Sequence, residues 1–159
     1  SRVVRIGRCR PPSPQHLHPE ALKMAGKKKG ALAPEVTAKV AELKAEAQAA
    51  MKEGSFSKAA EALDAAVKAG GGRSAELLHQ AASCHLAASQ PKDAIKACSA
   101  ALEVQPNHAA ALITRAKAYE HMGFYKQALA DASAAAAVNG APPEAAQLEA
   151  RVSAIIANN

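Results

Sequence analysis

The sequence has few aromatic residues and no tryptophan. Phe, Tyr and Trp make up 3% of the 159 residues, whereas hydrophobic residues make up 49%. A core built from this chain must therefore consist mainly of Ala, Leu, Val and Ile. Alanine has the highest helix propensity of all residues, and no stretch of the chain alternates apolar and polar residues in the manner of a strand. The composition predicts an all-α fold.

Long apolar runs and paired cysteines are also missing. No run approaches the roughly 18 apolar residues of a membrane helix, and no secretory signal is present. The three cysteines are odd in number and form no CxxC pair, which argues against a disulfide scaffold and favours a reducing compartment. We therefore expect no membrane partner and a cytoplasmic location. The alternative is a protein targeted to an organelle, if the basic N-terminus is a transit peptide.

Acidic residues are scarce at the N-terminal end. Residues 1–30 contain eight Lys and Arg but a single acid, Glu20, whereas the remainder contains twelve basic and thirteen acidic residues. With its prolines and its GKKKG run, this composition predicts an N-terminal tail over residues 1–33, disordered or bound to a partner. Because residues 34–159 are nearly neutral, we expect contact with nucleic acid only through the tail.

Motifs that carry catalysis or hold a cofactor are absent as well. The sequence contains no GxxxxGK[ST], no GxGxxG after a strand and no HExxH, and it places no Ser or Cys beside a plausible base. His16 and His18 form an HxH pair without a third metal ligand. Cys84 and Cys98 fall near apolar positions, which is typical of small reduced core residues. We therefore expect neither an enzyme nor a metal or cofactor site.

A helical pattern with a fixed repeat distance is present instead. From Pro34 onward the sequence predicts seven helices, several opened by Pro or by a capping Ser such as Ser74 and closed by Gly. Four sets of small residues recur at spacings of 35 and 34: Ala47, Ala82 and Ala116; Gly54, Ser89 and Gly123; Ala59, Ala94 and Ala128; and Ala66, Ala101 and Ala135. The extra residue of the first interval falls in the glycine linker at 70–72, where an insertion costs little. Four agreeing sets establish an internal repeat.

A helix–turn–helix unit of 34 residues with these positions resembles the tetratricopeptide repeat (TPR). The third unit matches best, with Leu112, Ala116, Tyr119, Gly123 and Tyr125 among the signature positions. The second unit departs at 85 and 91, where His and Pro replace the usual aromatics. The resemblance implies a right-handed α-solenoid of three repeats at about 40–73, 75–108 and 109–141, closed by a capping helix over 142–157 within a domain spanning 34–159.

In the TPR family, the first helix of each repeat lines a concave groove that binds an extended peptide or a partner helix. The groove residues implied for this chain are mixed in character and mostly uncharged, which suits a neutral or amphipathic peptide: Lys44, Gln48, Met51, Glu76, His79, Gln80, Ser83, Leu86, Ile113, Thr114, Lys117 and Glu120. The resemblance therefore predicts a non-catalytic protein–protein interaction module, such as a co-chaperone-like adaptor. The alternative is a structural subunit of a large multiprotein complex, anchored by its basic tail.

Co-chaperones of this family bind the acidic C-termini of chaperones through a clamp of Lys, Arg and Asn side chains. At the clamp positions of this chain Lys44 matches, Gln48 and Gln80 replace Asn, and Ala110 and Thr114 replace Lys and Arg. Each lost charged hydrogen bond removes about 1.5–3 kcal/mol, so the clamp is weakened by about two orders of magnitude. Lys117 is a substitute donor, whereas Arg115 lies one position, or about 100° of helix, too late. We therefore expect weakened binding of a chaperone C-terminal peptide and favour a different ligand.

Overall fold

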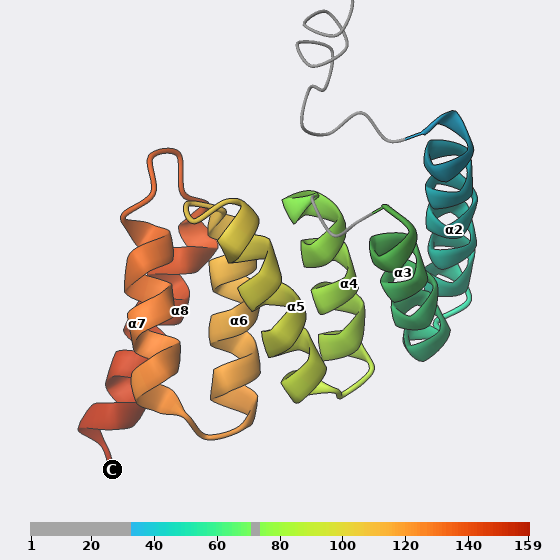
Figure 1. The fold of residues 1–159 in the computed structure, drawn as a ribbon. Coiled ribbons are helices and arrows are strands. Elements are labelled where there is room, and N and C mark those ends of the chain that lie inside the picture. Colours follow the sequence, from blue (N-terminus) through green and yellow to red (C-terminus); the bar gives the residue numbers. More distant parts are fainter. Residues whose placement is uncertain (1–32, 71–73) are drawn as a thin grey trace, which may run out of the picture. The chain divides into compact units, whose positions relative to one another are not determined.

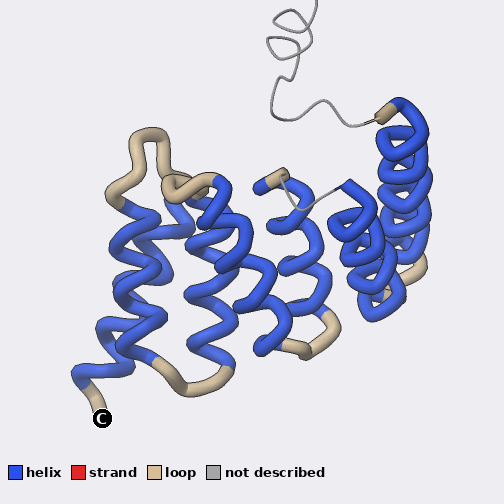
Figure 2. Tube along the Cα trace, in the orientation of Figure 1, coloured by secondary structure: helices blue, strands red, loops and turns tan. Residues whose placement is uncertain are grey.

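The computed structural model describes residues 33–70 and 74–159, so the predicted tail, apart from Ala33, and the middle of the glycine linker lie outside the described part. The described residues form seven α-helices and no strand (Figures 1 and 2), which confirms the all-α prediction. The helices are α2 (Pro34–Lys52), α3 (Phe56–Gly70), α4 (Ala75–Ala87), α5 (Pro91–Val104), α6 (Ala109–His121), α7 (Tyr125–Ala136) and α8 (Pro143–Ala157).

Consecutive helices pack against each other as antiparallel pairs. α2 packs on α3, α4 on α5 and α6 on α7, and the last pair is extended by α8 (Figure 1). Helix α6, the first helix of the third pair, also contacts α4, the first helix of the second pair, and the capping helix α8. This succession of helix pairs is an α-solenoid, in which each unit is stabilised mainly by its neighbours.

The turn inside each pair is the same structure three times. Gly54, Ser89 and Gly123 adopt φ of +77°, +61° and +78° at the ends of α2, α4 and α6. In each turn the next residue donates its N–H to the carbonyl five residues back: Ser55 to Ala50 at 2.8 Å, Gln90 to His85 at 2.8 Å and Phe124 to Tyr119 at 2.9 Å. This left-handed helix ending is the Schellman motif. The sequence column of Gly54, Ser89 and Gly123 therefore marks three equivalent turns.

The alanines that recur at the repeat spacing form the packed centre of each unit. All nine alanines of the three columns are 0% exposed: Ala47, Ala82, Ala116, Ala59, Ala94, Ala128, Ala66, Ala101 and Ala135. Alanine at these points lets the two helices of a pair approach closely, so a larger side chain would force them apart. The sequence repeat therefore has a packing origin.

Helix α8 covers the last repeat with the apolar face that the sequence predicts. Ala145, Leu148 and Val152 are buried against α6 and α7, and Ile156 packs at the edge of the same cluster. Ser133 of α7 adds a hydrogen bond to Glu149 of α8 at 2.6 Å. Among the described residues, no helix has the length and apolar character of a membrane span.

Candidate functional site

The predicted groove residues are carried by the first helices of the three pairs, on one face of each helix. Three lie on α2, five on α4 and four on α6, at intervals of three or four residues that align side chains along a helix. Gln48 and Glu76 are exposed and Lys44, Gln80 and Lys117 are half-buried, whereas Ile113 and Thr114 of α6 are buried. The predicted groove residues therefore include exposed and half-buried polar side chains, together with two buried residues, Ile113 and Thr114.

Two of these residues join neighbouring repeats directly. His79 Nε2 of α4 lies 3.2 Å from Thr114 Oγ1 of α6, and 3.4 Å from Ser83 Oγ. Both hydroxyl groups donate their own protons to backbone carbonyls, Thr114 to Ala110 at 2.9 Å and Ser83 to His79 at 3.0 Å. The structure thus brings three predicted groove residues into one hydrogen-bonded cluster.

The cluster fixes the tautomer of His79. Because both hydroxyl oxygens act as acceptors toward the ring, Nε2 carries the proton and donates it. Nδ1 is then a buried acceptor, and it has no hydrogen-bond partner within the described residues. Burial lowers the pKa of His79, the nearby His108 lowers it further, and Glu76 acts in the opposite direction. The geometry and the pKa shift both favour a neutral ring.

His108 is a neighbour of the predicted groove that the sequence analysis did not single out. Its Nδ1 accepts the Ala111 N–H at 3.1 Å and so caps the N-terminus of α6, while its ring centroid lies 5.4 Å from that of His79. Its Nε2 is 3.6 Å from Glu76 Oε2. Ser74 caps α4 as predicted, because its Oγ accepts the Leu77 N–H at 3.3 Å. His108 stands 34 residues after Ser74, so the repeat spacing was the signal that could have identified it as the cap of α6.

Helix α8 contacts the groove face of α6 through two ion pairs. Lys117 Nζ pairs with Glu144 Oε1. Arg151 donates two hydrogen bonds to Glu120, from Nε to Oε1 at 2.9 Å and from Nη2 to Oε2 at 2.6 Å. Glu120 and Arg151, with His121, also line a cavity of about 420 Å³. Both charged groove residues predicted on α6 are therefore paired with the capping helix.

Arg115, one position beyond Thr114, belongs to a different layer. Its guanidinium donates to Asp131 of α7 and, at 3.3 Å, to Ser99 of α5. The side chain is thus committed to the packing between α5, α6 and α7. This arrangement agrees with the helical-wheel argument that Arg115 cannot occupy the clamp position.

His85, expected to be a packing residue in an aromatic position, makes specific polar contacts. The ring is 7% exposed; its Nδ1 lies 2.9 Å from Gln90 Oε1 and its Nε2 lies 3.0 Å from Asp64 Oδ2. Asp64 is on α3 and His85 on α4, so this contact joins the first repeat to the second. Polar bridging at this point replaces the ring packing that an aromatic residue would supply.

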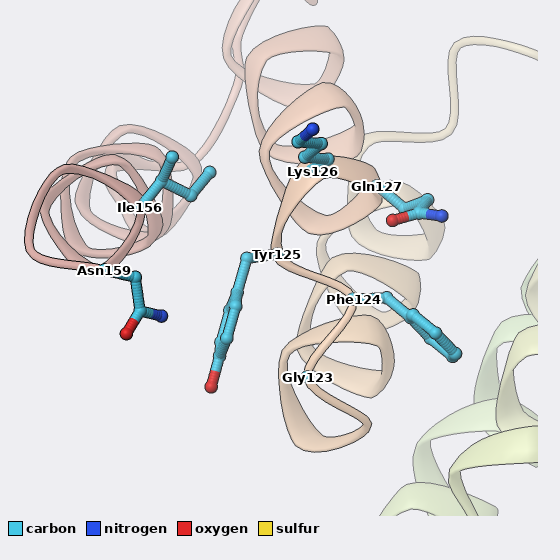
Figure 3. A pocket seen from close by; sticks show the side chains of 7 residues that line it. All are labelled: Gly123, Phe124, Tyr125, Lys126, Gln127, Ile156 and Asn159. Atoms are coloured by element: carbon cyan, nitrogen blue, oxygen red, sulfur yellow. The ribbon is translucent and has the colours of Figure 1, made fainter.

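A pocket outside the predicted groove lies at the turn between α6 and α7. It has a volume of about 400 Å³ and is lined by Gly123, Phe124, Tyr125, Lys126, Gln127, Ile156 and Asn159. In Figure 3 the Tyr125 ring points along the space between the turn and α8, whereas Phe124 points away from α8. Phe124 is 45% exposed. None of the twelve predicted groove residues lines this pocket.

The cysteines and acidic groups of the described residues do not assemble a metal site. No group of three or more His, Cys, Asp or Glu within these ranges has the geometry to hold a metal ion. Cys84 and Cys98 are buried and free. Burial raises the pKa of the Cys84 thiol and raises that of Cys98 to about 12. Both therefore behave as the small core residues that the sequence predicts.

A scan against protein-family models found no match, and neither did a search of curated proteins. Solved structures do match the fold. The second TPR domain of human RPAP3, in complex with the HSP70 peptide SGPTIEEVD, superposes with a TM-score of 0.69 at 19% identity, covering 74% of this chain and 98% of that one. The TPR2B domain of yeast Sti1, in its pHsp70 complex, gives a TM-score of 0.65 at 26% identity, with 72% and 96% covered.

The Sgt2 TPR domain of Aspergillus fumigatus gives a TM-score of 0.69 at 23% identity and covers 82% of this chain and 85% of that one. All three matches are TPR domains. They confirm the resemblance to the TPR family that the recurring small residues indicate.

Proposed function

We propose that this chain, whose fold is that of a TPR domain with a capping helix, is a non-catalytic interaction module that binds a segment of a partner protein along α2, α4 and α6. The observation that carries the proposal is the groove face itself. Partly exposed polar side chains follow one another on these three helices, and the contact of His79 with Thr114 joins the faces of α4 and α6 into one surface. Extended peptides bind such preformed surfaces with a small ordering cost in the receptor.

The solved neighbours support the same kind of ligand. The RPAP3 domain holds an HSP70 peptide, and the Sti1 domain is in a complex with pHsp70. A chaperone C-terminal peptide, and with it a co-chaperone-like adaptor role, is therefore the second candidate for this chain. Two features weigh against it: Ala110 offers no donor, and the Thr114 hydroxyl proton is used by the Ala110 carbonyl.

The ligand that the groove suits better is uncharged or amphipathic. Met51 and Leu86 add apolar surface on α2 and α4, and Gln48 and Gln80 offer carboxamides that both donate and accept hydrogen bonds. A segment with alternating apolar and polar side chains matches this lining. We therefore favour an internal stretch of a partner protein over a charged chain end.

Site-directed photo-crosslinking in a cell extract tests the groove. A photoreactive residue at Gln48 or Gln80 would report on the groove, and the same residue at Lys96, an exposed position on α5, provides the matched control. We expect both groove positions to form adducts with the same partner, mapped to one short segment by mass spectrometry, and Lys96 to form none with it. Adducts of equal yield at all three positions, or none at Gln48 and Gln80, would contradict the proposal.

A further inference from the structure

We propose that Glu144 of the capping helix takes the place of a ligand carboxylate at the α6 end of the groove and so selects against partners that present a free C-terminus. The inference rests on the proposed function and specifies which class of segment the groove accepts. It makes α8 a specificity element in addition to a cover for the core.

The lysine and the arginine of α6 are both already engaged. Lys117 is the cation that could replace the missing clamp residues, and its ammonium group pairs with Glu144. Arg115 forms a bidentate pair with Asp131 in the other layer. An incoming carboxylate would therefore meet a neutralised lysine and, beside it, a second carboxylate.

Glu144 is held in this position by the helix that carries it. It lies in the first turn of α8, where a negative charge is favoured by the partial positive charge of the helix N-terminus. The next residue, Ala145, is 0% exposed in the core shared with α6 and α7. The bidentate pair of Arg151 with Glu120 ties α8 to α6 a second time, two turns further on. The backbone that carries Glu144 is thus held beside the Lys117 ammonium group.

The other groups at this end of the groove cannot compensate. His79 donates its Nε2 proton to hydroxyl oxygens within the cluster and is favoured in its neutral form, so it adds no positive charge. Glu76 adds a further negative charge nearby. With the α6 end neutral or negative, the groove favours an internal segment that presents uncharged or basic side chains there.

The pair of Lys117 and Glu144 is partly exposed, with side-chain exposures of 36% and 53%. Exposed pairs contribute little energy, so a competing carboxylate is disfavoured only severalfold and one substitution suffices to reverse the preference. Glu144→Gln keeps the side-chain volume and frees the ammonium group. Glu149→Gln makes the same change in net charge on the same helix, at a residue that faces Ser133 of α7.

Calorimetry on the full chain with the peptide SGPTIEEVD and its C-terminal amide tests the inference. The quantity measured is the ratio of the Kd of the amide to the Kd of the acid. We expect a ratio below one for the wild type and for Glu149→Gln, because the acid meets the Glu144 carboxylate and the amide does not, and a ratio of about five for Glu144→Gln, the size of one freed exposed charge contact. Adding Lys117→Gln to Glu144→Gln should return the ratio to one.

A second readout does not depend on any ligand. Amine acylation followed by mass spectrometry should label Lys117 more slowly than Lys44 in the wild type, and at a similar rate in Glu144→Gln. A ratio of one or above in the wild type, no binding of the acid by Glu144→Gln, or equal labelling of Lys117 and Lys44 in the wild type would overturn the inference. The crosslinking at Gln48 and Gln80 reports separately, because groove adducts can form whether or not Glu144 governs the choice of ligand.

Discussion

The guanidinium of Arg115 and the carboxylate of Asp131 form a bidentate ion pair, with Nε–Oδ2 and Nη2–Oδ1 distances of 2.6 and 2.7 Å. The two side chains are only 22% and 11% exposed. The contact lies between α6 and α7 and reaches Ser99 of α5, so it links the second repeat to the third. The hydrogen bonds to Asp131, together with its negative charge, raise the pKa of Arg115, whereas burial acts in the opposite direction.

Asp131→Asn should lower the free energy of unfolding by about 2 kcal/mol, because it leaves a partly buried guanidinium without its counter-charge. The matched control is Asp93→Asn, which removes the exposed partner of Lys96 and should cost less than about 0.5 kcal/mol. Urea denaturation followed by circular dichroism measures both. Similar losses in the two variants would show that the Arg115–Asp131 pair adds no more than a surface contact.

Ser89→Gly should stabilise the protein, whereas Gly123→Ser should destabilise it. Ser89 adopts φ of +61° at a turn position where the other two repeats have glycine, and this backbone region costs an L-residue about 1 kcal/mol or more. A Cβ added at Gly123 meets no atom within 4 Å, so the expected loss of about 1 kcal/mol comes from the backbone alone.

The control for this pair is Ser153→Gly on the exposed side of α8. There the same substitution should lower stability by about 0.5–1 kcal/mol, because glycine is a poor helix former. Thermal unfolding of the three variants gives the comparison. A lower melting temperature for Ser89→Gly than for the wild type would argue against a strained turn in the second repeat.

Stability should fall as the pH drops below about 6.5, in part through His79. Its pKa is lowered in the folded protein, so between the unfolded pKa, about 6.5, and the folded pKa the unfolded chain binds a proton that the native state does not. Stability from this group is complete above the unfolded pKa and is lost progressively below it. The groups that act on the ring are His108 from α6, which works in the same direction, and Glu76 from α4, which opposes it.

His79→Gln should flatten this dependence, because the carboxamide can still donate to Thr114 but does not titrate. Urea midpoints at pH 7.5, 6.5 and 5.5 measure the slope, and His121→Gln, an exposed position at the end of α6, provides a control that should keep it. An unchanged slope in His79→Gln would assign the pH dependence to other groups.

Cys84 and Cys98 should resist thiol reagents in the native protein. Cys98 is 0% exposed and Cys84 is 3% exposed, and burial raises the pKa of both thiols, that of Cys98 to about 12. Since the thiolate is the reactive form, iodoacetamide at pH 8 should leave both unmodified until urea is added. Peptide mass spectrometry distinguishes the sites, and rapid labelling of Cys98 without denaturant would reopen a redox role.

The helices, their order and their repeat could be predicted from residue spacing because the packing is local. Ala47, Ala82 and Ala116 recur at fixed intervals since each faces the second helix of its own pair, and Gly54 and Gly123 recur since each closes the same turn. In a solenoid most contacts join neighbouring helices, so a pattern along the chain is also a pattern in space. The twelve groove residues follow from the same register, and the groove itself stays a prediction until a ligand is mapped.

Only the tertiary structure decided how the polar side chains are paired. No spacing rule connects Lys117 with Glu144, His79 with Thr114 or Arg115 with Asp131, because the partners come from different helices and long flexible side chains choose among several neighbours. The sequence by itself determined an all-α repeat with small residues at the helix contacts. The fold decided which of its charges remain free to meet a partner, because an ion pair depends on where two side-chain ends meet and not on where their residues stand along the chain.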